Sequence, residues 1–196
     1  MRFSSDKRIP ISAAIPQLYI NPLDQKRVEY FFKKMPHLIE EGYKNGCYRF
    51  CRIVLGIIRK AISTGNPPPG AGVSWAPLSA KSLELYQRWG HSKTHPWYVL
   101  GEMLRQVNIF VNNHQRFYVG MPRGVMATHP NPKHRGQKYT LATIASYLEA
   151  GGDHYPPRPL FNPAFKSAGG KERLTKFVVE DLRKLFRKYG YNPYKK

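Results

Sequence analysis

The feature that most constrains the fold is a long helical pattern between Pro36 and about Ser63. Apolar residues recur there at spacings of three and four, as on the buried face of an amphipathic helix. The apolar stripe consists of Leu38, Ile39, Tyr43, Cys47, Phe50, Cys51, Val54, Leu55 and Ile58. We expect this helix to be the spine of the domain. A shorter helix should precede it, from an N-cap at Asp24 to Met35, because proline breaks or kinks a helix.

The segment 106–121 has a different periodicity, with apolar residues at every second position on either side of an asparagine-containing turn. This alternation predicts a β-hairpin. Helical patterns also cover 79–89, with Ser79 as N-cap, 141–150 and 171–189, and one or two helical turns are expected within 97–105. The sequence therefore predicts an α+β fold. In it, a long N-terminal helix and a C-terminal helix pack on a small, mostly antiparallel sheet.

Proline and glycine mark the limits of the expected domain. Residues 1–22 contain three prolines and little helical periodicity, which predicts an extended N-terminal arm. Residues 23–190 are expected to form a single α+β domain, and residues 191–196 a basic C-terminal tail. Residues 122–138 are basic, contain histidine and lack periodicity, so they predict a long exposed loop. A rigid extended element is expected at 156–159.

The charge of the chain limits its possible partners. Its 196 residues include 32 Lys and Arg against 12 Asp and Glu, a formal net charge of +20 at pH 7. Nucleic acid and acidic protein surfaces both suit this excess. The basic residues are scattered along the whole chain, and no apolar run reaches the roughly 20 residues that span a bilayer, so no membrane partner is expected. The N-terminus lacks the apolar core of a signal peptide, and two cysteines make no disulfide framework, which favours a cytosol-like compartment.

The cysteines and histidines that could bind a metal or act in catalysis lack the additional ligands or acidic residues that such sites need. Cys47 and Cys51 are four residues apart, but zinc needs four ligands and both lie on the apolar stripe, so packing in the core is preferred. Four histidines lie in two polar loops: His91, His95, His129 and His134. No Asp or Glu occurs between Arg105 and Leu148 to orient a histidine or bind a hard metal. These histidines are therefore interpreted as solvated residues at a protein or nucleic-acid contact.

No nucleophile elbow, phosphate loop, zincin or dinucleotide fingerprint occurs in the chain. A Ser-His-Asp or Cys-His arrangement assembles only in the fold, so the sequence leaves that possibility open. With no positive support for catalysis, we predict no enzymatic activity and no cofactor. No catalytic, cofactor-binding or metal-binding residue is predicted either.

Three segments in a fixed order resemble a known family. Residues 75–79 (WAPLS), between a long helix and a short one, look like the W-x-P-L-S element of phage virion-morphogenesis proteins. Residues 100–105 (LGEMLR), before a hairpin ending in 118–120 (YVG), resemble their TG-x-L turn and V-x-V-G strand, although leucine replaces the usual threonine. Residues 144–152 (IASYLEAGG) and 156–165 (PPRPLFNPAF) are similar to their A-x-I-x-E-x-G and P-x-R-P-F-L-x-P-A signature.

The family is that of tail-completion, or head-to-tail joining, proteins of tailed bacteriophages. The resemblance implies a structural virion protein that forms a sixfold homo-oligomeric ring at the neck, assembled in the bacterial cytoplasm. Its partners would be head connector or adaptor proteins and the tail tube or tail terminator protein. The basic surface would face acidic neighbouring proteins or the DNA in the lumen, and the sequence does not decide between them. Two alternatives stay open: a tail terminator that caps the tail tube, and a basic nucleic-acid-binding protein.

Seven residues are predicted to form ring or partner interfaces: Trp75, Leu78, Arg123, Arg135, Arg158, Pro159 and Phe161. The stiff segment 155–160 would lose little entropy on docking, and Arg158 would offer a planar fork to a carboxylate or a backbone carbonyl. Arg158→Glu is accordingly expected to leave the monomer folded but to abolish its incorporation into virions. An equally weighted interpretation is that Pro156 and Pro157 merely position the last helix.

Overall fold

The computed structural model describes residues 22–70, 72–91, 95–98, 101–112, 115–128, 133, 139–152 and 156–189. Within these residues the fold is α+β, with six helices and two separate two-stranded antiparallel sheets, so the predicted class is confirmed. The chain divides into two units, residues 1–37 and residues 38–196. The predicted arm up to residue 21 and the tail 191–196 lie outside the described residues, as does Arg135.

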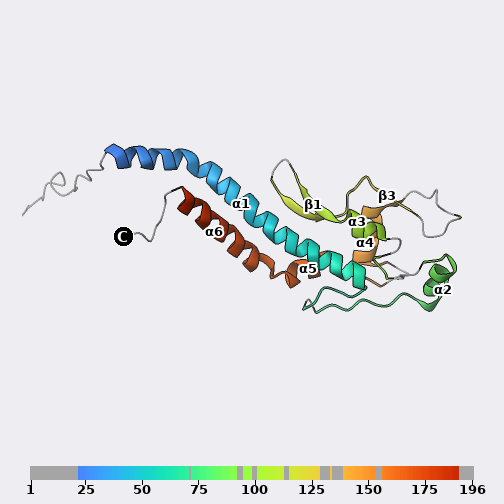
Figure 1. Ribbon diagram of the computed structural model, residues 1–196. Coiled ribbons are helices and arrows are strands. Elements are labelled where there is room, and N and C mark those ends of the chain that lie inside the picture. Colours follow the sequence, from blue (N-terminus) through green and yellow to red (C-terminus); the bar gives the residue numbers. More distant parts are fainter. Residues whose placement is uncertain are drawn as a thin grey trace, which may run out of the picture. The chain divides into compact units, whose positions relative to one another are not determined.

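Helix α1 runs from Pro22 to Thr64 without interruption (Figure 1). The prediction of two helices separated at Pro36 is wrong, because Pro36 lies inside α1. Proline removes one backbone hydrogen bond, to the carbonyl of Phe32, and crowds that carbonyl. Phe32 is 62% exposed, so this turn of the helix is open to water, which can solvate the carbonyl that loses its donor. The loss of one bond is therefore tolerated in a helix of 43 residues.

Within residues 38–196, α1 and the C-terminal helix α6, Gly170–Lys188, lie side by side (Figure 1). Two glycines of α1 allow this approach. A Cβ atom on Gly46 would lie 2.5 Å from the Cα of Val178, and one on Gly42 would lie 2.5 Å from Cδ2 of Leu182. The contact positions rise along one helix as they fall along the other, so the two helices are antiparallel.

The predicted hairpin is confirmed. Strand β1, Asn108–Val111, pairs antiparallel with strand β2, Phe117–Gly120. Ile109 lies opposite Val119, and both pack against the core. Among the described residues of the turn, Gln115 takes the left-handed backbone conformation, with φ of 56°, and Asn113 lies outside the described residues. The Gln115 side-chain amide donates to a carboxylate oxygen of Glu40, which ties the turn to α1.

The segment predicted as a loop without regular structure contains a short strand. Strand β3, Met126–Ala127, pairs antiparallel with strand β4, Tyr139–Thr140. Next to β3, Thr128 donates to Glu102 from its backbone nitrogen at 2.9 Å and from its hydroxyl at 2.6 Å. Glu102 begins the short helix α3, Glu102–Gln106. Sequence periodicity could not reveal β3, because two residues are too few to show an alternation.

The remaining helices are short. Helix α2, Ala80–Arg88, begins after Ser79, whose hydroxyl accepts a hydrogen bond from a backbone N–H of the first turn, as predicted. Helix α4, Leu141–Ala150, ends at Gly151, which has φ of 74°. Helix α5, Phe161–Ser167, was not predicted, since seven residues show little periodicity.

The hydrophobic core of residues 38–196 is built from α1, the short helices and the chain around Trp97. Its largest fully buried side chains are Trp97, Leu38, Ile58, Ile62, Leu141, Leu160 and Val107. Cys47 and Cys51 are both buried, as predicted from their place on the apolar stripe. Across the described ranges, we find no helix with the length and apolar character needed to cross a membrane.

Candidate functional site

Arg158 lies at the centre of a cluster that joins distant parts of the chain, and we call this the Arg158 cluster. The residue is only 4% exposed. Its Nε donates to the carbonyl of Ala76 at 2.9 Å, and its Nη2 donates to the carbonyl of Pro77 at 3.1 Å. The guanidinium therefore acts as a fork for two backbone carbonyls of its own chain. Hydrogen bonds from a charged donor are stronger than those between neutral groups.

Two tryptophans complete the Arg158 cluster. Trp75 donates from Nε1 to the carbonyl of Pro159 at 2.9 Å, and Trp97 donates from Nε1 to the carbonyl of Arg158 at 3.1 Å. The two indole rings lie 6.3 Å apart, and the Trp97 ring meets Phe161 edge-to-face at 5.9 Å. Both indole N–H groups thus have partners where burial requires them.

Glu149 holds the same proline-rich segment from α4. Its Oε2 accepts hydrogen bonds from the backbone nitrogens of Leu160 at 2.7 Å and Phe161 at 3.3 Å. Leu160 is the N-cap position of α5 and provides no side-chain cap of its own. The Glu149 carboxylate therefore caps α5, where a negative charge is favourable. The backbone nitrogen of Arg158 donates to the carbonyl of Leu148 at 2.7 Å, which closes the link to α4.

The electrostatics of the Arg158 cluster follow from burial. Loss of solvent lowers the pKa of Arg158 from its usual value, and the hydroxyl of Tyr86 opposes that shift. Burial likewise raises the pKa of Tyr86, and the Arg158 charge opposes it. Both shifts penalise the charged form, as desolvation does. The carbonyls of Ala76 and Pro77 stabilise the cation in compensation, so the cluster holds the fold together.

The structure separates the predicted interface residues. Four of the seven meet in the Arg158 cluster: Trp75, Arg158, Pro159 and Phe161. Leu78 is half-buried next to it, whereas Arg123 is exposed in the turn between β2 and β3, and Arg135 lies outside the described residues. The geometry gives Arg158 a role within its own chain. The expectation that Arg158→Glu leaves the monomer folded therefore has to be revised.

Two residues that position this site, Trp97 and Glu149, were not among the predicted interface residues. A signal existed for Glu149, because it is the glutamate of the segment 144–152 that resembles the family signature and the only acidic residue between Glu102 and Asp153. Trp97 gave no comparable signal, since it lies at the boundary between the polar segment 90–96 and the short helical pattern within 97–105, where no periodicity marks it.

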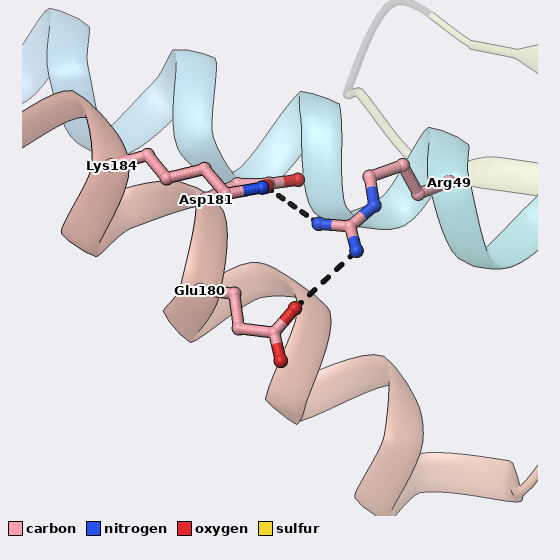
Figure 2. A network of polar contacts seen from close by, with 4 residues as sticks. All are labelled: Arg49, Glu180, Asp181 and Lys184. Atoms are coloured by element: carbon pink, nitrogen blue, oxygen red, sulfur yellow. Dashed lines mark hydrogen bonds and ion pairs between the residues drawn. The ribbon is translucent and has the colours of Figure 1, made fainter.

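Ion pairs join α1 to α6 (Figure 2). Arg49 lies 2.6 Å from Asp181 through Nη1 and 3.3 Å from Glu180 through Nη2, and Lys184 lies 3.3 Å from the same oxygen of Asp181. The Arg49 guanidinium also lies over the Phe177 ring, 4.3 Å from its centroid. Asp181 is buried, and its Oδ2 has no hydrogen-bond partner among the described residues. Losing Arg49 would leave this buried carboxylate with less compensation, so the network specifies how the two helices align.

An apolar cavity of about 250 Å³ lies between α1, the hairpin, α5 and α6. It is lined by Tyr43, Cys47, Phe50, Cys51, Val54, Ile58, Phe117, Val119, Phe161, Phe165 and Leu174. Burial raises the pKa of the Cys47 thiol, opposed by Tyr43, and raises the pKa of Cys51 from 9.0 to about 11. Because the thiolate is the reactive and metal-binding form, both cysteines are held in their inert form at neutral pH.

This protonation state predicts slow alkylation. With a pKa of about 11 in place of 9.0, the thiolate fraction of Cys51 at pH 8 is about a hundredfold smaller than in the unfolded chain. Iodoacetamide should therefore react at least that much more slowly with the folded protein, and the rate should rise with pH up to about 11. Cys47→Ala isolates the Cys51 rate. Equal rates in folded and denatured protein at pH 8 would contradict this expectation.

The same shift has a consequence for stability. The folded state keeps the Cys51 proton to a higher pH than the unfolded state, so deprotonation favours unfolding. The free energy of unfolding should therefore fall as pH rises from about 9 toward 11.

In the part of the chain that the structure describes, no three His, Cys, Asp or Glu side chains lie close enough together to hold a metal ion. Of the four histidines considered above, His129 and His134 lie outside that part. No family model, curated protein or solved structure matches this chain.

Proposed function

We propose that the protein is a structural subunit of the neck of a tailed bacteriophage, which forms a ring that joins the head connector to the tail. The observation that carries the proposal is that segments resembling the family's signature bind one another. Residues 75–77 bind Arg158 and Pro159 in the Arg158 cluster, and Leu148 and Glu149 bind residues 158–161. These residues both resemble the family signature and hold distant segments of the chain together. Proteins that share one fold would keep residues with that role, so the contacts support membership of the family.

The hairpin supplies a surface suited to subunit contact. Phe110 and Tyr118 lie opposite each other in the β1–β2 register, on the face away from Ile109 and Val119. They are 38% and 48% exposed. Exposed aromatic pairs of this kind are typical of protein interfaces, because they bury large areas on association. We call this pair the outer hairpin face and assign it to contact with a neighbouring subunit.

The double variant Phe110→Ser/Tyr118→Ser tests the outer hairpin face. It should lower the oligomer mass measured by size-exclusion chromatography with light scattering, because aromatic anchors supply much of an interface's binding energy. The melting temperature of the monomer should change little, since both side chains are exposed. Tyr147→Ser, an exposed tyrosine on α4, serves as the control and should leave the oligomer unchanged. An unaltered oligomer mass in the double variant would remove the hairpin from the interface.

Electron microscopy of a lysate in which the gene is silenced tests the function itself. Filled heads beside unattached tails of normal length are the result expected of a joining protein. Tails of uncontrolled length would instead indicate a tail terminator. Intact particles would refute a neck role and leave the alternative of a basic nucleic-acid-binding protein.

A further inference from the structure

The second half of α1 is rich in basic residues and has no acidic residue of its own, although Lys44 pairs with Glu40 and Arg49 pairs with Asp181 and Glu180 of α6. From Gly42 to Thr64 it contains five Lys and Arg and no Asp or Glu. Three of these residues surround Gly56: Arg52 four positions before it, and Arg59 and Lys60 three and four positions after it. Positions at these spacings are neighbours on a helix surface. All three side chains are exposed, so they form one cationic patch.

Gly56 has no packing role in this patch. A Cβ atom there would meet no other atom within 4 Å, whereas at Gly42 and Gly46 it would collide with α6. Glycine in a helix interior is less stable than alanine, so a glycine without a packing reason calls for another explanation. Gly56 is exposed, so its backbone lies between the three cations without a side chain to cover it.

We propose that Arg52, Gly56, Arg59 and Lys60 form a binding site for the phosphates of a nucleic-acid backbone, and we call it the Gly56 site. The guanidinium groups of Arg52 and Arg59 offer planar, paired donors that match phosphate oxygens. Because Gly56 has no side chain, the sugar-phosphate backbone of the nucleic acid can come close to the helix there. Arg59 donates from Nη2 to the carbonyl of Val107 at 3.2 Å. That bond orients a guanidinium that carries five N–H donors in all.

The surroundings favour nucleic acid over an acidic protein. Tyr48 lies one turn before Arg52 and is half-exposed, and Lys44 lies one turn before Tyr48. Tyr48 and Arg52 are four positions apart and are therefore neighbours on the helix surface. An exposed aromatic ring beside exposed cations is a combination that single-strand binding surfaces use, because bases stack on the ring while the cations contact phosphates. The nearest acidic residue on this helix, Glu40, pairs with Lys44 at 2.7 Å, away from Arg52, Arg59 and Lys60.

Fluorescence anisotropy with short labelled DNA, duplex and single-stranded, tests the Gly56 site on the purified full chain. Gly56→Leu keeps the net charge but covers the exposed backbone at position 56, and it should weaken DNA binding severalfold. Arg52→Gln/Lys60→Gln should lower the affinity about tenfold and reduce the slope of log affinity against log salt by about 2. Lys176→Gln/Arg183→Gln, exposed residues of α6 with the same charge change, is the matched control and should have a much smaller effect.

Three results would overturn the inference. An equal loss in the α6 control would show that net charge alone drives binding. Unchanged binding by Gly56→Leu would exclude a close approach at Gly56, and circular dichroism verifies that this variant is folded. Tighter binding of poly-glutamate than of DNA at the same salt concentration would assign the patch to an acidic protein. The inference does not rest on the neck proposal, since purified protein and DNA suffice to decide it.

Discussion

Arg158→Glu is expected to destabilise residues 38–196 by about 4 kcal/mol, the size typical of breaking a buried charged network. The change removes both donors to the carbonyls of Ala76 and Pro77 and puts a carboxylate beside these two acceptors. An acceptor facing acceptors in a buried site is uncompensated, so the link between residues 75–77 and 158–159 should break. The measurement is the free energy of unfolding from urea titration, followed by tryptophan fluorescence because Trp75 and Trp97 lie in the cluster.

Two variants make this result specific. Arg158→Lys keeps the charge but lacks the planar fork, so it should lose part of the stability and fall between the wild type and Arg158→Glu. Arg123→Glu has the same charge reversal at an exposed turn and should change the free energy of unfolding by less than about 0.5 kcal/mol. An Arg158→Glu protein as stable as Arg123→Glu would refute the role of the Arg158 cluster. It would restore the interpretation of Arg158 as an interface residue.

Sequence periodicity predicted the elements whose side chains face one core. The hairpin and the helices that follow Ser79 and end at Gly151 appeared where the pattern placed them, because burial on one face imposes a period on the sequence. The failures lie in elements too short to show a period, β3 and α5, and at Pro36. Pro36 was expected to end a helix by local rules alone, and a single lost hydrogen bond proved tolerable in α1.

The candidate site was predicted in part, and for a physical reason. The sequence singled out Arg158 and Trp75. It could not show that the Arg158 guanidinium donates to the carbonyls of Ala76 and Pro77, the two residues that follow Trp75. Those contacts span more than 80 positions of the chain. A guanidinium can donate equally well to a carboxylate of a partner protein and to backbone carbonyls of its own chain. The residue type alone therefore does not tell whether Arg158 acts in an interface or within the fold. Only the fold decides which acceptors come within reach.

The three glycines of α1 should respond to alanine with opposite signs, which is the second large effect that we expect. Gly46→Ala places a methyl group 2.5 Å from the backbone Cα of Val178, which cannot move without shifting α6. Overpacking of this kind costs typically 1–3 kcal/mol, and we expect a loss of about 3 kcal/mol in the free energy of unfolding. Separation of α1 from α6 would also lengthen the ion pairs of Arg49, which adds to the loss.

Gly42→Ala should cost less than Gly46→Ala, because its closest contact is the end of the flexible Leu182 side chain. Gly56→Ala should stabilise the protein by about 1 kcal/mol, since alanine is the better helix former and the new methyl group meets open space. Urea titration of the three variants measures this order. Because helix propensity is the same in all three, the difference between Gly46→Ala and Gly56→Ala isolates the packing of α1 against α6. Equal stabilisation at positions 46 and 56 would mean that α6 does not pack on α1 in solution.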